Sequence, residues 1–425
     1  MDKDPAVEAE LDSFSLTFPL PYRVALLTVL GVWAWGANLH YLSLVKIDVP
    51  SLIRYPPRQS HNQPPHYLTT YRFATLLTIP LVLSYTFFLL VTHHDTSLVL
   101  YYDYLPITLL ILLFLMLLFP LQLPLPIRHQ FSQTGRLRFL QVLRRISTGY
   151  IAQTSEGKFG DILLADVLTS YAKPLADLFV SFCMFFSAAP ISATARPDRN
   201  CGGQLLVPLI IAIPSAIRFR QCMIEFLRVR KGNMRSGSIG TSGWGGQHLA
   251  NALKYASAFP VIIFSALQRS KEDPSVAASG NAHHYHRAWL LAVAVNSLYS
   301  FYWDVAKDWD LSLFSASRER NDPHHPYGLR ARLYFSPTTI YYLVIATDLL
   351  LRCTWSLKLS PHLANFADFE SGIFLMEVAE VGRRWIWIFF RVETEWVRST
   401  TSAGLGGPGG DDILLGEYNG KDEDD

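Results

Sequence analysis

Charged side chains recur at helical spacing inside otherwise apolar stretches in the second half of this sequence. Residues three, four or seven positions apart share one face of a helix, so each set would form a polar stripe. The five sets are Asp166, Thr169, Ser170 and Lys173; Asn251, Lys254 and Tyr255; Asp304, Lys307 and Asp308; Asp348, Arg352 and Trp355; and Glu377, Glu380, Arg383 and Arg384. One such pair alone would indicate a salt bridge at a helix end. Five stripes in consecutive segments favour a shared polar interior.

The mixture of bases and acids in these stripes predicts a site for a tetrahedral oxyanion. Arginine binds phosphate oxygens through a two-pronged fork, whereas lysine acts as a point charge. A charge near the centre of a bilayer costs roughly 2.5–3.5 kcal/mol, so these side chains should face one another or a watery cavity. We expect the bases to coordinate the anion and two acids to orient them; these residues are Lys254, Arg352, Arg383 and Arg384, with Asp166 and Glu380.

The rest of the composition indicates a membrane protein. Half of the 425 residues are hydrophobic and only 17% are charged, whereas a soluble domain has about a quarter charged residues. Three early blocks carry no formal charge: Val24–Val45, Phe73–His94 and Tyr104–Ile127. Each is long enough to cross a hydrocarbon core of about 30 Å, which takes about 20 helical residues.

Later apolar blocks are shorter and are bounded by charge. They are Leu178–Ala195, Asn200–Ile217, Tyr255–Gln268, Ala288–Trp303, Leu333–Thr347 and Trp385–Phe390. The last four reach the length of a span only if neighbouring charged residues enter the membrane. We therefore predict an all-α, polytopic transmembrane helix bundle with nine to ten spans.

The span count depends on the basic, amphipathic stretch Gly135–Ile146, which could lie in the membrane interface or cross as a tenth span. Loops rich in Lys and Arg alternate with loops poor in them, and the rich loops are expected on the cytoplasmic side. These are 128–161, 218–247 and 307–332, with the C-terminus on the same side. Nine spans would leave the N-terminus outside, and ten would put both ends in the cytoplasm.

The chain divides accordingly into five predicted segments. These are a polar N-terminal segment (1–21), N-terminal transmembrane helices (22–127), a basic interfacial or short spanning segment (128–160), a main transmembrane domain (161–400) and a disordered acidic tail (401–425). The four cysteines, Cys183, Cys201, Cys222 and Cys353, are expected to be buried small hydrophobic residues rather than a disulfide framework.

Several classes of function find no support. The net charge of +2 and the lack of a basic, aromatic-rich run exclude a nucleic-acid partner. The Gly-rich stretch Gly232–Gly246 lacks the Gly-Lys-Ser/Thr ending of a phosphate-binding loop, and the chain has no Gly-x-Ser-x-Gly elbow. The histidine clusters have no carboxylate or cysteine at the spacing of metal ligands, so we expect no bound metal. We also expect no cofactor, and we do not expect the protein to be an enzyme. A membrane glycosyltransferase that uses Asp304 and Asp308 as metal-binding acids is a weaker alternative.

Six motifs along about 230 residues resemble the EXS family, the membrane domain of eukaryotic phosphate exporters related to the xenotropic and polytropic retrovirus receptor. They are Leu164–Ser170 (LADVLTS), Ile213–Cys222 (IPSAIRFRQC), His248–Tyr255 (HLANALKY), Trp303–Trp309 (WDVAKDW), Asp348–Trp355 (DLLLRCTW) and Glu377–Glu393 (EVAEVGRRWIWIFFRVE). The resemblance implies a phosphate pathway between the helices. Matched to the motifs, its lining would comprise Asp166, Thr169, Arg218, Lys254, Tyr255, Asp304, Arg352, Glu380, Arg383 and Arg384, with Trp355 as a gate.

Two departures from the family pattern affect the expectations. The exporters begin with a soluble SPX regulatory domain, whereas about 20 residues precede the first apolar block here, so that control is expected to be absent or supplied otherwise. Ile224 and Glu225 stand where the family often has further arginines, which argues against a second anion site there.

The form without SPX resembles the short fungal, ER-retention-defective members of the family. This implies a multi-pass protein of the Golgi, or of the endoplasmic reticulum membrane, that returns luminal phosphate from glycosylation to the cytosol. It also implies effects on glycoprotein processing and on retention of luminal ER proteins. The alternative is a scaffold without transport, which would hold Golgi glycosyltransferases through its cytoplasmic loops and tail. The lipid bilayer and inorganic phosphate are the expected partners, with sorting partners possible.

Overall fold

A computed structural model describes residues 13–56, 64–119, 133–187, 192–236, 244–270, 282–315, 326–354 and 369–404. Within these ranges every regular element is a helix, which confirms the predicted all-α class. The predicted gate Trp355, part of the Gly-rich stretch (237–243) and the tail from residue 405 lie outside the described residues.

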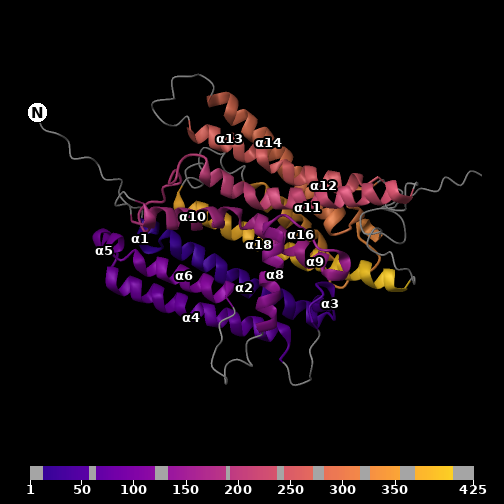
Figure 1. Cartoon of the computed structure of the whole chain (residues 1–425), viewed down its shortest axis with the longest axis horizontal. Helices are drawn as coiled ribbons and strands as arrows, with labels where there is room; N and C mark the ends of the chain where they lie inside the picture. Colours follow the sequence, from indigo (N-terminus) through magenta and orange to yellow (C-terminus); the bar gives the residue numbers. More distant parts are fainter. Residues whose placement is uncertain are drawn as a thin grey trace, which may run out of the picture.

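The first half of the chain forms a group of three long helices. These are α2 (Leu20–Leu44), α4 (His66–Thr92) and α6 (Tyr104–Leu118), with short helices α1 (Ser13–Thr17), α3 (Val49–Leu52) and α5 (Thr96–Tyr101) at their ends. Tyr22, Leu77 and Leu110 pack in the core that joins the three. Helix α6 ends at Leu118, before the predicted end at Ile127, because Phe119 is extended. The group occupies the lower part of Figure 1, in indigo and purple.

The second half adds the helices that carry the charged motifs. They are α9 (Lys158–Ser170), α10 (Ala172–Phe186), α11 (Leu206–Ser236), α12 (Gly246–Ala256), α13 (Ala258–Ser270), α14 (Ala282–Trp303), a π-helical turn η2 (Asp304–Asp308), α16 (Thr339–Arg352) and α18 (Glu370–Gly404). Helices α9 and α10 are separated at Tyr171, and α12 and α13 at Ser257. Helix α18 contacts α2, α9 and α16 and so links the two halves, while α13 and α14 form the opposite edge from α4 (Figure 1).

Four helical segments are long and apolar enough to cross a membrane: Leu20–Leu44, His66–Thr92, Leu206–Gly232 and Gly246–Gln268, with Tyr104–Leu118 as a shorter apolar helix. The chain is therefore a multi-pass membrane protein. The segment Gly246–Gln268 includes Lys254, which lies outside the uncharged block Tyr255–Gln268. A buried charge thus belongs to this candidate span.

The basic helix α8 (Gln133–Ser147) runs across the long helices rather than along them (Figure 1). It packs against α6 and α9. Arg145 attaches it there, with Nε 2.7 Å and Nη2 2.5 Å from the two carboxylate oxygens of the fully buried Asp161. This orientation favours the interfacial reading of the stretch Gly135–Ile146 over a tenth span.

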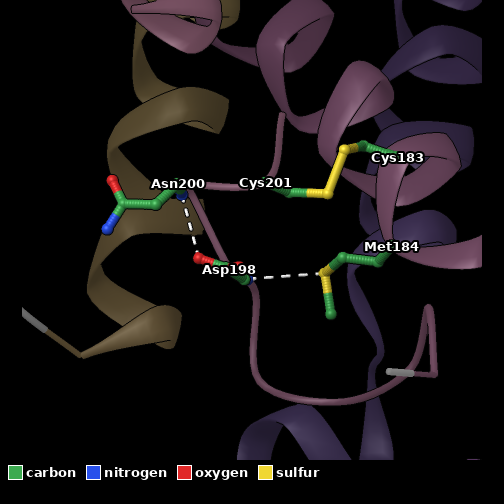
Figure 2. The surroundings of a disulfide bond; sticks show 5 residues. All are labelled: Cys183, Met184, Asp198, Asn200 and Cys201. Carbon is green, nitrogen blue, oxygen red and sulfur yellow. Dashed lines mark hydrogen bonds between the residues drawn. A yellow bond between two sulfur atoms is a disulfide. The ribbon is translucent and has the colours of Figure 1, made fainter. Parts of the chain in front are cut away.

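A disulfide joins Cys183, near the end of α10, to Cys201 in the following loop (Figure 2). The prediction that all four cysteines are unpaired was wrong for these two; Cys222 and Cys353 are free. Around the disulfide the Asp198 amide donates to Met184 Sδ at 3.4 Å, and the Asn200 amide donates to Asp198 Oδ1 at 2.9 Å. The apolar surroundings of both cysteines hid the pairing.

The loop that carries the disulfide also shortens two predicted blocks. Helix α10 ends at Phe186 rather than Ala195. Helix α11 begins at Leu206 rather than Asn200, because Gly202 and Gly203 adopt positive φ angles of 77° and 104° just before it. Disulfides persist in oxidising compartments, and the count of Lys and Arg predicts this loop on the side opposite the cytoplasm. We call this part of the bundle the disulfide end.

Removal of the disulfide should lower stability. We expect Cys201→Ala to cost about 2–4 kcal/mol, the usual effect of losing a cross-link over a loop of this size. A lower Tm of the purified protein in detergent would show it, with Cys353→Ala, which removes a free thiol, as the matched control. An unchanged Tm for Cys201→Ala, or alkylation of Cys183 in the unreduced protein, would contradict the assignment.

Candidate functional site

Helix α18 presents charged residues along one face over most of its length. They follow one another at intervals of three, four or seven: Glu370, Glu377, Glu380, Arg384, Arg391 and Glu395. At a rise of 1.5 Å per residue this stripe is about 37 Å long, which exceeds the hydrocarbon core of about 30 Å. A charged stripe of membrane length therefore lies along this helix.

Asp304 is the most enclosed carboxylate of the network. It is fully buried and is approached by three cations: Lys254 Nζ lies 3.0 Å from Oδ1, Arg383 Nη1 lies 3.5 Å from Oδ2, and Arg352 Nη2 also contacts Oδ2. Arg352 and Arg383 both contact Asp348 as well, at 3.0 and 2.9 Å. This cluster joins α12, η2, α16 and α18.

The π-helical turn η2 sets the geometry at this point. Both Asp304 and Asp308 reach Lys254 Nζ, at 3.0 and 3.3 Å, so one ammonium bridges the two acids of the turn. Asp308 also lies 3.8 Å from Arg391 Nε on α18. Isolated π-helical turns occur frequently at functional sites, and here the turn aims two acids at one cation.

Asp166 forms a second centre, on α9. Its Oδ1 accepts hydrogen bonds from Arg218 Nε at 2.7 Å and from the Tyr255 hydroxyl at 2.5 Å. The Arg218 guanidinium stacks over the Tyr255 ring at 4.9 Å, and its Nη1 donates to Gln221 Oε1 at 2.7 Å. Gln221 was missed by the sequence-based prediction, although its position three residues after Arg218 puts it on the same helix face.

Arg384 differs from the other cations of the network. Its Nε donates to Ser170 Oγ at 2.9 Å and its Nη2 to Thr169 Oγ1 at 3.1 Å, and its guanidinium stacks on Trp387 at 4.6 Å. No carboxylate of the described residues lies within 4.0 Å of it. The neighbouring Glu380 is instead held by both Nε and Nη2 of Arg383, at 2.8 and 2.7 Å. Arg384 is thus a positive charge that is 93% buried and donates only to hydroxyls, one of which, Ser170 Oγ, donates in turn to Glu380 Oε1 at 2.6 Å.

The structure brings together all of the predicted pathway residues that it describes. They divide between the Asp304, Asp166 and Arg384 clusters, and Trp355 lies outside the described residues. The expected division of roles needs refinement. Of the four bases predicted to coordinate an anion, Lys254, Arg352 and Arg383 are paired with carboxylates, and Arg384 is not.

A further buried cluster was missed near the end of α18. Glu393 is fully buried; it contacts Arg330 and the Tyr341 hydroxyl and accepts a hydrogen bond from the Tyr334 amide at 2.6 Å. These contacts fix residues 329–335 against α18. Glu393 stands nine residues after Arg384 and off the charged stripe, so helical spacing gave no signal for it.

Fold and site together define a class of protein: a helical, multi-pass membrane protein in which cations and carboxylates from separate helices meet inside the bundle. The sequence profile of the EXS family matches residues 18–397. The chain belongs to the EXS family.

Similar proteins fall into two groups. Protein ERD1 homolog 2 of Schizosaccharomyces pombe is 28% identical over 88% of this chain and 95% of its own length. Protein ERD1 homolog 1 of the same organism is 29% identical over 93% of this chain and 95% of its own length. Solute carrier family 53 member 1 of Mus musculus is 25% identical over 62% of this chain and only 36% of its own length.

Proposed function

We propose that this protein carries inorganic phosphate across a membrane of the secretory pathway, with the Golgi membrane as its site of action. The observation that carries the proposal is Arg384, a buried guanidinium halfway along a membrane-length polar stripe that has hydroxyl partners but no carboxylate. A buried charge without a direct ion pair of its own is costly, and an oxyanion at hydrogen-bond distance would pair with it. The Ser170 hydroxyl donates to Glu380 Oε1 at 2.6 Å and the Thr169 hydroxyl to the Asp166 carbonyl at 2.7 Å, and either would donate to the anion only after turning from that partner.

Entry of the anion would proceed by exchange with a carboxylate. The network formally balances five cations with five carboxylates: Arg218, Lys254, Arg352, Arg383 and Arg384 against Asp166, Asp304, Asp308, Asp348 and Glu380. The Glu380 side chain is 39% exposed although it lies about 15 Å along α18 from Glu370, and we propose that it turns away from Arg383 when the anion arrives. Phosphate would then bridge the forks of Arg383 and Arg384.

The balance of charge suits transport. A network with a large excess of cations would hold the anion, whereas here the displaced Glu380 carboxylate competes for Arg383 and promotes release. A scaffold that only retains other proteins has no use for such buried charges, each of which costs roughly 2.5–3.5 kcal/mol. The loop 237–243 and the tail 405–425, on which the scaffold alternative depends, lie outside the described residues.

We further propose nine crossings, with α9–α10 and α12–α13 each counted as one and α8 in the interface. This places the start of α2 at the disulfide end, where Arg23 contacts Glu370, and the end of α18 in the cytoplasm. The similarity to the mouse solute carrier supports transport. Phosphate, the lumen-to-cytosol direction and the effect on glycoprotein processing and ER retention follow from the resemblance to the exporters and to the short fungal members.

Phosphate flux into proteoliposomes tests the proposal directly. Purified protein should accelerate the movement of radiolabelled phosphate well above the leak of protein-free liposomes. Unlabelled phosphate should compete with the label, and chloride should not, because a monatomic anion cannot bridge two guanidinium forks. Flux equal to that of protein-free liposomes would refute the proposed function.

A further inference from the structure

One face of α2 holds residues that directly follow the anion-site residues in the sequence. This face, the α2 seat, consists of Leu27, Gly31, Ala34 and Asn38. Their offsets of zero, four, seven and eleven place them on one side of the helix. Helix α2 packs against both α10 and α18, so the seat can fix two separate helices against each other.

Tyr171, the residue between α9 and α10, occupies the first half of the seat. Its hydroxyl donates to the Leu27 carbonyl at 3.0 Å. A Cβ atom on Gly31 would lie 2.2 Å from this hydroxyl oxygen and 3.2 Å from the ring carbon that bears it. Any larger residue at position 31 would therefore push the hydroxyl out, and Tyr171 would lose its acceptor on α2.

Trp385 on α18 occupies the second half of the seat. Its Nε1 donates to the Ala34 carbonyl at 3.0 Å, and its own carbonyl accepts from Nδ2 of the fully buried Asn38 at 3.2 Å. Both the side chain and the main chain of Trp385 are thus bound to α2. The two accepting carbonyls of the seat stand seven residues, about 10.5 Å, apart on a regular helix.

Both seated residues adjoin the anion site in the sequence. Tyr171 follows Ser170, and Trp385 follows Arg384. The Arg384 guanidinium donates to Ser170 Oγ at 2.9 Å and to Thr169 Oγ1 at 3.1 Å. The seat on α2 therefore holds the hydroxyl side and the guanidinium side of the site at a fixed separation.

We propose that Tyr171 and Trp385 are positioning residues for the anion, which set the spacing between the Arg384 guanidinium and the hydroxyls of Ser170 and Thr169. The inference rests on the proposed function and names the residues that determine its affinity for phosphate. The polar atoms of both residues are bound to α2, so each acts through its neighbour and not by contact with the anion. Donors must be held in the productive geometry to bind an oxyanion well, so loss of the seat should weaken phosphate binding.

The test measures the KM of phosphate flux in proteoliposomes for full-length Tyr171→Phe, Gly31→Ala and the double variant. Tyr171→Phe loses one hydrogen bond and should raise KM about threefold to tenfold. Gly31→Ala expels the hydroxyl from the seat and should raise KM by at least about tenfold. The double variant should have a lower KM than Gly31→Ala, because the phenyl ring lacks the oxygen that the new methyl group would meet.

Gly36→Ala is the matched control. Gly36 lies on the same helix, but a Cβ atom there would lie 2.9 Å from the ring of Tyr71 on α4. Tyr171→Phe should therefore not lower the KM of Gly36→Ala. Trp385→Phe, which loses the N–H donor to α2, should raise KM as Tyr171→Phe does. In each variant the maximal rate per folded protein should change less than KM.

The outcomes separate this inference from the proposed function. A wild-type KM in both Tyr171→Phe and Gly31→Ala, or an equal KM in Gly31→Ala and the double variant, would overturn the inference and leave phosphate transport intact. Variants that lower Tm in detergent without a change in KM would show a purely structural contact and would also overturn it. Absence of saturable flux in wild type would instead refute the proposed function.

Discussion

Arg384→Ala is expected to reduce phosphate flux by about tenfold to a hundredfold while the protein still folds. A charged hydrogen bond contributes about 1.5–3 kcal/mol, and each 1.4 kcal/mol is a factor of ten. Because no carboxylate pairs with Arg384, its removal leaves no buried acid without a partner; only the Thr169 and Ser170 hydroxyls lose a donor. The measurement is initial flux in proteoliposomes at matched protein density.

Two further variants make this result specific. Arg384→Lys keeps the charge but loses the planar fork, so its flux should lie between wild type and Arg384→Ala. Arg144→Ala removes an arginine from the exposed side of α8 and should leave flux unchanged. Wild-type flux in Arg384→Ala would show that the anion does not bind at this guanidinium.

Asp304→Asn is expected to destabilise the protein by about 3–5 kcal/mol, the usual cost of removing one partner from a buried ionic cluster. Asp304 is fully buried between Lys254, Arg352 and Arg383. Its neutralisation leaves excess positive charge among helices α12, α16 and α18. Thermal or denaturant unfolding in detergent would measure the loss.

Asp310→Asn provides the control for this effect. Asp310 lies in the same segment of the chain but is half exposed, and its contact with Arg398 is long, at 3.3 Å, so its loss should cost less than about 1 kcal/mol. The double variant Asp304→Asn with Arg352→Met should recover part of the stability, because it removes one of the uncompensated cations. Equal stability of Asp304→Asn and Asp310→Asn would contradict the central place given to Asp304.

Helical spacing alone located much of this network. Asp348 and Arg352 were placed on one face by their separation of four, and they do pair at 3.0 Å. The short apolar blocks required charged residues inside candidate spans, and Lys254 lies inside one. Such inferences succeed because the period of the helix is fixed and membrane length sets the minimum for each span.

The choice of partners between helices could not be predicted in the same way. Any of several cations could have faced Asp304, and nothing in the spacing distinguishes Arg383, which has carboxylate partners, from the adjacent Arg384, which has none. The ion pair of Lys173 with Glu377, at 3.4 Å, spans 204 positions of the sequence, and the disulfide was concealed by its apolar setting. These features depend on how the helices pack.

Helix α18 is held at its start, near its middle and toward its end. Glu370 pairs with Arg23 of α2 and with Arg199 of the disulfide loop. Trp385 Nε1 donates to the Ala34 carbonyl of α2 at 3.0 Å, and Glu393 pairs with Arg330. Two other candidate spans are interrupted instead, α9–α10 at Tyr171 and α12–α13 at Ser257. In mechanical terms α18 is a fixed axis, and the half-helices α10, α12 and α13 are the parts able to pivot. Alternating exposure of Arg384 to the two sides would then come from tilting of these half-helices, while the charged face of α18 keeps its position.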